Sequence, residues 1–165
     1  MRTRGVMRSE TGLRLTLGAL AVIGLGIAAY LTVVHYEGGD PVCLAGGESC
    51  AKVQESEYAD LLGVPVPLIG IVGYLTILTA ALIPSDLGRF LGVFAGLVGA
   101  GFSIYLTYLE LFEIDAVCQW CVGSAIVMGL ALAVALVRAV RFGGRGGTHQ
   151  NRITDERKEQ IDGIA

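Results

Sequence analysis

The sequence predicts an all-α integral membrane protein, a four-transmembrane-helix bundle with a long extracytoplasmic loop that contains a short half-helix. Of its 165 residues, 53% are apolar and only 16% are charged, whereas about 25% of the residues in a soluble domain are charged. The charges are also unevenly distributed, because four windows contain no Asp, Glu, Lys or Arg: 15–34, 61–85, 90–109 and 116–137. These two observations favour a polytopic membrane protein over a soluble one.

Each of the four windows is long enough to cross a bilayer. A hydrocarbon core about 30 Å thick needs about 20 apolar residues in a helix, and the windows are apolar on all sides, as expected in lipid. We therefore predict spans over about 13–34, 64–84, 90–109 and 116–138. A soluble protein is disfavoured because too few flanking residues remain to cover four such helices. The first window is also too long for the apolar core of a cleaved signal peptide, which has about 7 to 15 residues.

The basic residues predict the side of the membrane that each connecting segment occupies, because Lys and Arg concentrate on the cytoplasmic side. Arginines precede the first span and follow the last one: Arg2, Arg4, Arg8, Arg14, Arg138, Arg141 and Arg145. The segment 35–60 has six acids and one basic residue, Lys52, and the segment 110–115 has three acids and no Lys or Arg. Both segments are therefore predicted to lie outside the cytoplasm. Both termini are therefore predicted to be cytoplasmic. The net charge of −3 averages a basic inner and an acidic outer face and indicates no nucleic-acid partner.

The predicted organisation has three parts. A cytoplasmic segment covers 1–12, a four-helix transmembrane domain covers 13–138, and a cytoplasmic polar tail covers 139–165. In the long outer loop, several apolar residues predict a short half-helix lying along the membrane surface: Val53, Tyr58, Leu61 and Leu62.

All four cysteines fall on the predicted extracytoplasmic side. Cys43 and Cys50 lie in the long outer loop, and Cys118 and Cys121 lie where the last span begins. Because disulfides persist outside the cytoplasm, we expect Cys43 to pair with Cys50 and Cys118 to pair with Cys121. A bond between Cys50 and Cys118 fits the sequence as well, so the pairing of the resting state stays open.

The segment Cys118-Gln119-Trp120-Cys121 has the Cys-X-X-Cys spacing of redox-active dithiols. At a helix start this spacing puts both sulfurs on one face, and the free N–H groups of the first turn stabilise a thiolate. The pair lies at the predicted membrane interface, where a lipid-soluble carrier of two electrons can reach it. These features predict a redox relay with a quinone as the electron acceptor.

Two other interpretations of the cysteines remain open. Structural disulfides explain Cys43 and Cys50 well, although Cys-X-X-Cys closes a tight and strained ring. A thiolate metal site, in a metal-binding or transport protein, is the other alternative, but the spacing of Cys43 and Cys50 departs from that of zinc sites. Transport is further disfavoured because the charge-free windows offer no ionisable group inside the membrane.

Four motifs follow one another along 13–138. They are the loop pair Cys43 and Cys50, then Ser56 with Tyr58 and Ala59, then Gly63-Val64-Pro65-Val66-Pro67 with Gly70 and Tyr74, and finally Cys118-Gln119-Trp120-Cys121. In this order, on a four-span plan, they resemble the vitamin K epoxide reductase family and in particular its bacterial branch.

The resemblance implies a membrane oxidoreductase that passes electrons between two cysteine pairs. The thiolate of a thioredoxin-like (DsbA-like) partner would attack the loop disulfide at Cys43, Cys50 would exchange with Cys118, and Cys121 would lie nearest the quinone. The partner's dithiol would be oxidised and the quinone reduced, so that disulfide bonds form outside the cytoplasm. The family's loop serine corresponds to Ser56, expected near the quinone or in support of the loop; a helix cap is its alternative role.

Two positions depart from the vertebrate members, in which an asparagine and a tyrosine hydrogen-bond the naphthoquinone. Val66 and Ala125 occupy those positions here. The resemblance therefore implies a respiratory quinone, menaquinone or ubiquinone, rather than vitamin K 2,3-epoxide, and a location in the bacterial inner membrane. The segment after Arg138 is too short for the thioredoxin-like domain that many bacterial members carry, so a separate periplasmic protein is the expected partner.

Overall fold

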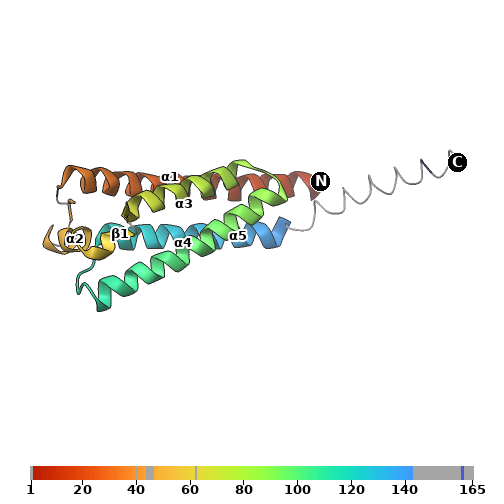
Figure 1. The fold of residues 1–165 in the computed structure, drawn as a ribbon. Helices are drawn as coiled ribbons and strands as arrows, with labels where there is room; N and C mark the ends of the chain where they lie inside the picture. The colour runs from red at the N-terminus through yellow and green to blue at the C-terminus, as the bar shows by residue number, and fades with distance from the viewer. Residues whose placement is uncertain (1, 40, 44–46, 62, 143–160, 162–165) are drawn as a thin grey trace.

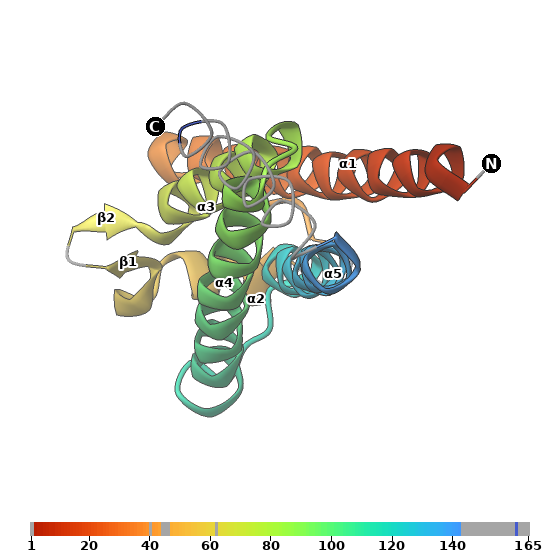
Figure 2. The same cartoon turned by 90° about the vertical axis from the view of Figure 1, so that its right-hand side faces the viewer.

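A closed bundle of long helices dominates the fold. The computed structural model describes residues 2–39, 41–43, 47–61, 63–142 and 161. Its long helices are α1 (Arg2–Glu37), α3 (Val66–Leu82), α4 (Asp86–Phe112) and α5 (Gln119–Phe142). Both α1 and α4 pack against α3 and α5, which closes the bundle (Figures 1 and 2). The prediction of a mainly helical bundle is confirmed.

Short elements connect α1 to α3. They are helix α2 (Gly47–Gln54), the 3-10 turn η1 (Glu57–Ala59) and two antiparallel strands, β1 (Asp60–Leu61) and β2 (Val64–Pro65). Gly63, in the turn between the strands, has a φ of 80°, which glycine adopts without strain. In Figure 1, α2 and β1 lie at the end of the bundle away from the N-terminus.

The short helix of this loop lies earlier than the apolar residues predict. Val53 belongs to α2, but α2 ends at Gln54, and Tyr58 and Leu61 fall in η1 and β1. Leu62 lies outside the described residues. The predicted helix does not continue because the chain turns at Gly63 and pairs Leu61 with Val64 in the hairpin.

The outer surface of the bundle is apolar. Among the described residues, three helical segments are long and apolar enough to cross a membrane: Ser9–Glu37, Asp86–Phe112 and Gln119–Phe142, while α3 is a shorter apolar helix. Large side chains such as Val22, Phe94 and Ile126 are more than half exposed. Soluble monomers rarely expose apolar patches of that extent, so contact with lipid accounts for this surface.

The observed helix ends differ from the predicted spans. α1 begins at Arg2 rather than near 13, α4 extends beyond both ends of 90–109, and α5 begins at Gln119 and ends at Phe142. α3 is shorter than 64–84 because Val64 and Pro65 form β2. The charge-free windows miss these ends because a helix continues through polar residues at the membrane surface. Most of the predicted tail, 143–160 and 162–165, lies outside the described residues.

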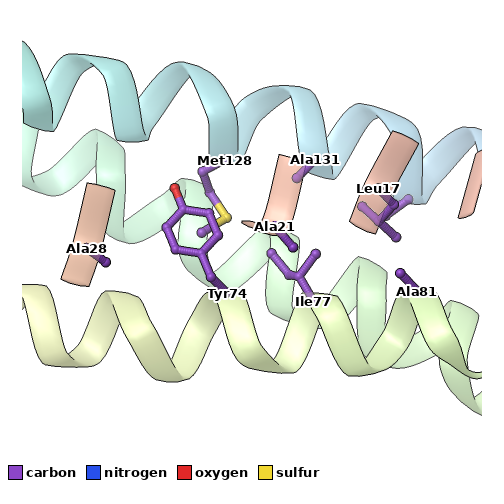
Figure 3. Packing of buried hydrophobic residues seen from close by; sticks show 9 residues of the cluster. Leu17, Ala21, Ala28, Tyr74, Ile77, Ala81, Met128 and Ala131 are labelled. Atoms are coloured by element: carbon purple, nitrogen blue, oxygen red, sulfur yellow. The ribbon is translucent and has the colours of Figure 1, made fainter. Parts of the chain in front are cut away.

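Alanines, three larger apolar side chains and one buried tyrosine form the core where α1, α3 and α5 meet (Figure 3). The cluster consists of Leu17, Ala21, Ala28, Tyr74, Ile77, Ala81, Met128, Ala131 and Ala135. The Tyr74 hydroxyl lies 2.9 Å from the backbone oxygen of Ser124 and 2.8 Å from its Oγ. Gly24 makes room for the ring, since a Cβ there would lie 2.1 Å from a ring carbon of Tyr74. Tyr74 therefore joins all three helices.

Two arginines satisfy the free carbonyl groups at the end of α3. Arg14 donates to the backbone oxygens of Ala81 and Leu82 at 2.8 and 2.6 Å. Arg138, which is 1% exposed, donates to the oxygens of Ala80 and Ile83, both at 2.8 Å. The last carbonyls of a helix have no partner within it, so these contacts explain why charged groups are tolerated there.

Candidate redox site

The outer cysteine pair forms a disulfide, as the sequence predicts. Cys43 is bonded to Cys50 in α2. Cys50 is 1% exposed, whereas Cys43 is partly exposed. The two sulfurs of this bond therefore differ in access, and Cys43 is the one that another molecule can reach.

The segment next to Cys43 is fixed to the start of α5. Its anchor is Val42, whose backbone N–H donates to the Tyr30 hydroxyl at 3.0 Å and whose oxygen accepts from Trp120 Nε1 at 2.9 Å. The rings of Tyr30 and Trp120 lie 4.9 Å apart. Because Trp120 is the residue before Cys121, these contacts hold the outer pair close to the inner one.

The inner cysteine pair, by contrast, consists of free thiols. Cys118 precedes α5 and is fully buried, and Cys121 lies in the first turn and is partly exposed. The expected Cys118–Cys121 bond is thus not formed, because this structure holds the dithiol form of the pair, in which the two side chains are hydrogen-bonded to each other. The Cys50–Cys118 alternative is not formed either.

The start of α5 favours the thiolate of Cys118. A hydrogen bond from the Cys121 thiol, followed by those from the N–H groups of Cys121 and Trp120, lowers the pKa of the Cys118 thiol to about 7 against the opposing effects of burial and of the Glu110 charge. Free N–H groups at a helix N-terminus stabilise negative charge. Cys118 is therefore ready to act as a nucleophile or a leaving group in thiol–disulfide exchange.

Replacing Cys121 with Ala should raise the pKa of the Cys118 thiol, because the variant lacks the thiol that donates to its sulfur. In protein with the inner pair reduced, thiolate absorbance should increase with pH around a midpoint of about 7 and be lost as the pH falls below it. The midpoint in Cys121→Ala should lie higher. The titration is read in a Cys43→Ser/Cys50→Ser background, so that only the inner cysteines contribute, and an unchanged midpoint would contradict the hydrogen bond.

A cavity of about 490 Å³ lies beside the inner pair, lined by residues of all four long helices and of the short elements of the loop. Cys121 forms part of its wall, and Cys118 does not. Three lining side chains on α3 and α4, Val72, Phe94 and Val98, are more than half exposed on the apolar outer surface. The cavity is therefore accessible from the lipid side.

The structure brings together two of the three predicted quinone contacts. Ser56 and Val66 line the cavity with Cys121, whereas Ala125 does not. Ser56 Oγ donates to the backbone oxygen of Val53 at 2.8 Å and makes no side-chain cap to η1. Ser56 thus supports the end of α2 and also borders the cavity.

Glu110 is the residue of the site that the sequence analysis missed. It was counted with the acids of an outer loop, but it lies in α4, is 3% exposed, and lines the cavity. Its Oε2 accepts from the backbone N–H of Cys118 at 3.2 Å, and its side chain lies against Cys121. An ionisable residue adjoining an apolar window is a signal for such a role, but the charge-free windows excluded it by definition.

The structure gives the metal alternative no support. Within the described ranges, no group of three or more His, Cys, Asp or Glu residues is arranged to hold a metal ion. Cys43 and Cys50 are bonded to each other, so their sulfurs are not available as thiolate ligands.

Comparisons with known proteins agree with this site. The model of the vitamin K epoxide reductase family matches residues 15–136, a range that includes all four cysteines. The thiol-disulfide oxidoreductase LTO1 of Arabidopsis thaliana is 36% identical over 112 residues, which cover 60% of this chain and 29% of the relative. This chain therefore spans less than a third of the length of that relative. The extent of the family match, over both cysteine pairs and the helices between them, shows that the chain belongs to the vitamin K epoxide reductase family.

Proposed function

We propose that this protein is a membrane thiol oxidoreductase that passes electrons from a thioredoxin-like partner through Cys43 and Cys50, then Cys118 and Cys121, to a membrane quinone. The net result is disulfide bond formation in the extracytoplasmic space. The observation that carries the proposal is the position of Cys121 in the wall of a cavity that lipid-soluble molecules can enter. The name of the relative, a thiol-disulfide oxidoreductase, supports the same chemistry.

The outer step is thiol–disulfide exchange at Cys43. The partner's thiolate attacks the partly exposed Cys43 sulfur, the Cys43–Cys50 bond breaks, and Cys50 leaves with the electron pair. The partner's second thiol then attacks the mixed disulfide, which releases the oxidised partner and the Cys43 thiol. The buried position of Cys50 favours this order, because the partner does not reach its sulfur from outside.

The inner step moves the electrons from Cys50 to the Cys118–Cys121 disulfide. The thiolate of Cys50 attacks Cys118, and Cys121 leaves as a thiolate; attack of Cys43 on Cys50 then restores the outer disulfide and frees Cys118. The bonded outer pair and the free inner pair correspond to the state after this transfer. The Val42 anchor to Trp120 supports the short distance that direct exchange requires.

The cavity suits a quinone ring. Its volume of about 490 Å³ lies within the range of small-molecule sites, about 300–1,000 Å³, and its wall is mostly apolar with few polar groups, among them Ser56, Glu110 and Ser124. A bound quinone would accept two electrons and two protons. Val66 offers no polar contact to such a ring, which favours menaquinone or ubiquinone over vitamin K 2,3-epoxide as the acceptor.

The proposed topology has four crossings, with α3 as the short one and 13–138 as the transmembrane redox domain. The two ends of the bundle support this topology, because Arg14 and Arg138 meet at the end of α3, whereas the cysteines lie at the start of α5 and in the connection between α1 and α3. Lys and Arg favour the cytoplasmic side. We therefore propose a bacterial inner membrane location, with cytoplasmic termini and the cysteines outside.

Reconstitution tests the proposal directly. Purified protein in lipid should convert menaquinone or ubiquinone to quinol when supplied with a reduced thioredoxin-like protein, with one partner disulfide formed per quinol, as measured by quinone absorbance and thiol alkylation. Failure of both quinones to be reduced, with the outer disulfide still reducible by the partner, would contradict the relay. Stoichiometric zinc in elemental analysis of the same sample would favour the metal alternative instead.

A further inference from the structure

Glu110 is a buried acid in direct contact with both inner cysteines. It is 3% exposed in the last turns of α4. Its Oε2 accepts from the Cys118 N–H at 3.2 Å, and its side chain lies against the Cys121 thiol. The same side chain lines the cavity. Glu110 therefore lies against the backbone of Cys118, the thiol of Cys121 and the space where an acceptor would lie.

The turn after α4 creates this contact. Two backbone hydrogen bonds close this turn: Ile114 N–H donates to the backbone oxygen of Leu109 at 2.9 Å, and Ala116 N–H donates to the backbone oxygen of Glu110 at 3.1 Å. Asp115, within the turn, has a φ of 50°. These bonds bring the chain back so that α5 begins beside the end of α4. The Glu110 side chain then satisfies an N–H group at the start of α5, as the glutamate of a capping box does, but from a neighbouring helix.

Burying the carboxylate of Glu110 at this position costs free energy of folding. Burying a charge without a charged partner is strongly unfavourable, and in the described part of the chain no Lys, Arg or His forms an ion pair with Glu110. The groups that the structure places against it are an amide and two thiols, those of Cys118 and Cys121. A carboxylate within hydrogen-bond reach of a thiol that must ionise has the geometry of a general base.

We propose that Glu110 is the proton acceptor for Cys121 when the inner pair is oxidised, an inference that rests on the function proposed above. The Cys121 S–H bond breaks, its electron pair stays on Sγ, and the proton forms an O–H bond on Glu110. As the Cys118–Cys121 bond forms, two electrons leave for the quinone, and the Glu110 carboxyl group releases its proton into the same cavity. The second proton is the one that Cys118 loses as it ionises, so that two electrons and two protons are accounted for.

Glu110→Gln separates proton transfer from positioning. The Gln side chain has the same size and its oxygen still accepts from the Cys118 N–H, but it cannot take up a proton. With the inner pair reduced beforehand, the single-turnover rate of its oxidation by added menaquinone should fall about 10²-fold, the lower range for loss of a general base. Glu113→Gln is the matched control, since Glu113 is exposed and only three residues away, and its rate should equal that of the wild type.

A spectroscopic measurement tests the contact without quinone. Infrared difference spectra between the dithiol and disulfide forms, poised with a small-molecule thiol and its disulfide, should contain a carboxylate band, because the Cys121 thiol beside Glu110 is lost when the disulfide forms. The band should disappear in Glu110→Gln and persist in Glu113→Gln. If Glu110→Gln does not fold, the band in the wild type and in Glu113→Gln still decides the contact.

The outcomes are distinguishable. If the single-turnover rate is that of the wild type in Glu110→Gln but reduced in Glu110→Ala, Glu110 only caps the start of α5 and the proposal is overturned. Absence of the carboxylate band from the wild-type spectrum would overturn it as well. If quinone does not oxidise the wild-type inner pair, the proposed function fails, while the infrared spectra still report on Glu110.

Discussion

Replacing Cys121 with Ser should reduce quinone reduction by the reconstituted protein at least about 10³-fold, the scale expected when an essential nucleophile is removed. Cys121 is the cysteine in the wall of the cavity, and no disulfide can form within the inner pair without it. Quinone reduction driven by a reduced thioredoxin-like protein is the measurement. The Cys43–Cys50 disulfide should remain intact in this variant, as shown by alkylation and mass spectrometry.

Cys43→Ser is the informative comparison for this result. It removes the sulfur that the partner attacks, so turnover driven by the partner should be lost. Oxidation of a previously reduced inner pair by quinone should continue, because Cys118 and Cys121 are unchanged. The structural-disulfide alternative expects reduced thermal stability in Cys43→Ala and Cys43→Ser without loss of partner-driven activity. Retained turnover in Cys121→Ser would refute the relay.

Gly24→Ala should destabilise the bundle by about 1–3 kcal/mol, the usual cost of adding a methyl group to a packed core. A Cβ at Gly24 would lie 2.1 Å from the ring of Tyr74, which is 1% exposed and packed between helices. The ring must move, and the bonds from its hydroxyl to Ser124 are strained or lost. The thermal unfolding midpoint in detergent should therefore fall. Quinone affinity should weaken too, because Tyr74 and Ser124 line the cavity.

Gly26→Ala is the matched control in the same helix. Nothing lies within 4 Å of a Cβ at Gly26, and alanine favours a helix over glycine by about 0.5–1 kcal/mol, so this variant should be neutral or slightly more stable. In a Tyr74→Leu background, the cost of Gly24→Ala should largely vanish, because the clashing ring is gone. An equal loss of stability in both backgrounds would show that the destabilisation does not arise from Tyr74.

Three of the four apolar windows coincide with helices that, among the described residues, are long and apolar enough to cross a membrane, but the windows miss the helix ends. A window without charges stops at the first acid or base, so Glu110 was placed in a loop and α1 was expected to begin near residue 13. The structure continues α4 to Phe112 and begins α1 at Arg2. One charged residue before the predicted start of α1 has a partner, because Glu10 pairs with Arg89 at 3.0 Å.

The sequence by itself determined the residence of this chain in a membrane and the spacing of its cysteine pairs. Both are properties of residues that are near one another along the chain, and composition and spacing express them directly. Only the tertiary structure decided which residues surround those cysteines: Val42 hydrogen-bonded to Trp120, Glu110 hydrogen-bonded to the Cys118 N–H and lying against Cys121, and a cavity that includes Ser56 but not Ala125. These contacts depend on how the helices and the turn after α4 are packed, which spacing along the chain does not reveal.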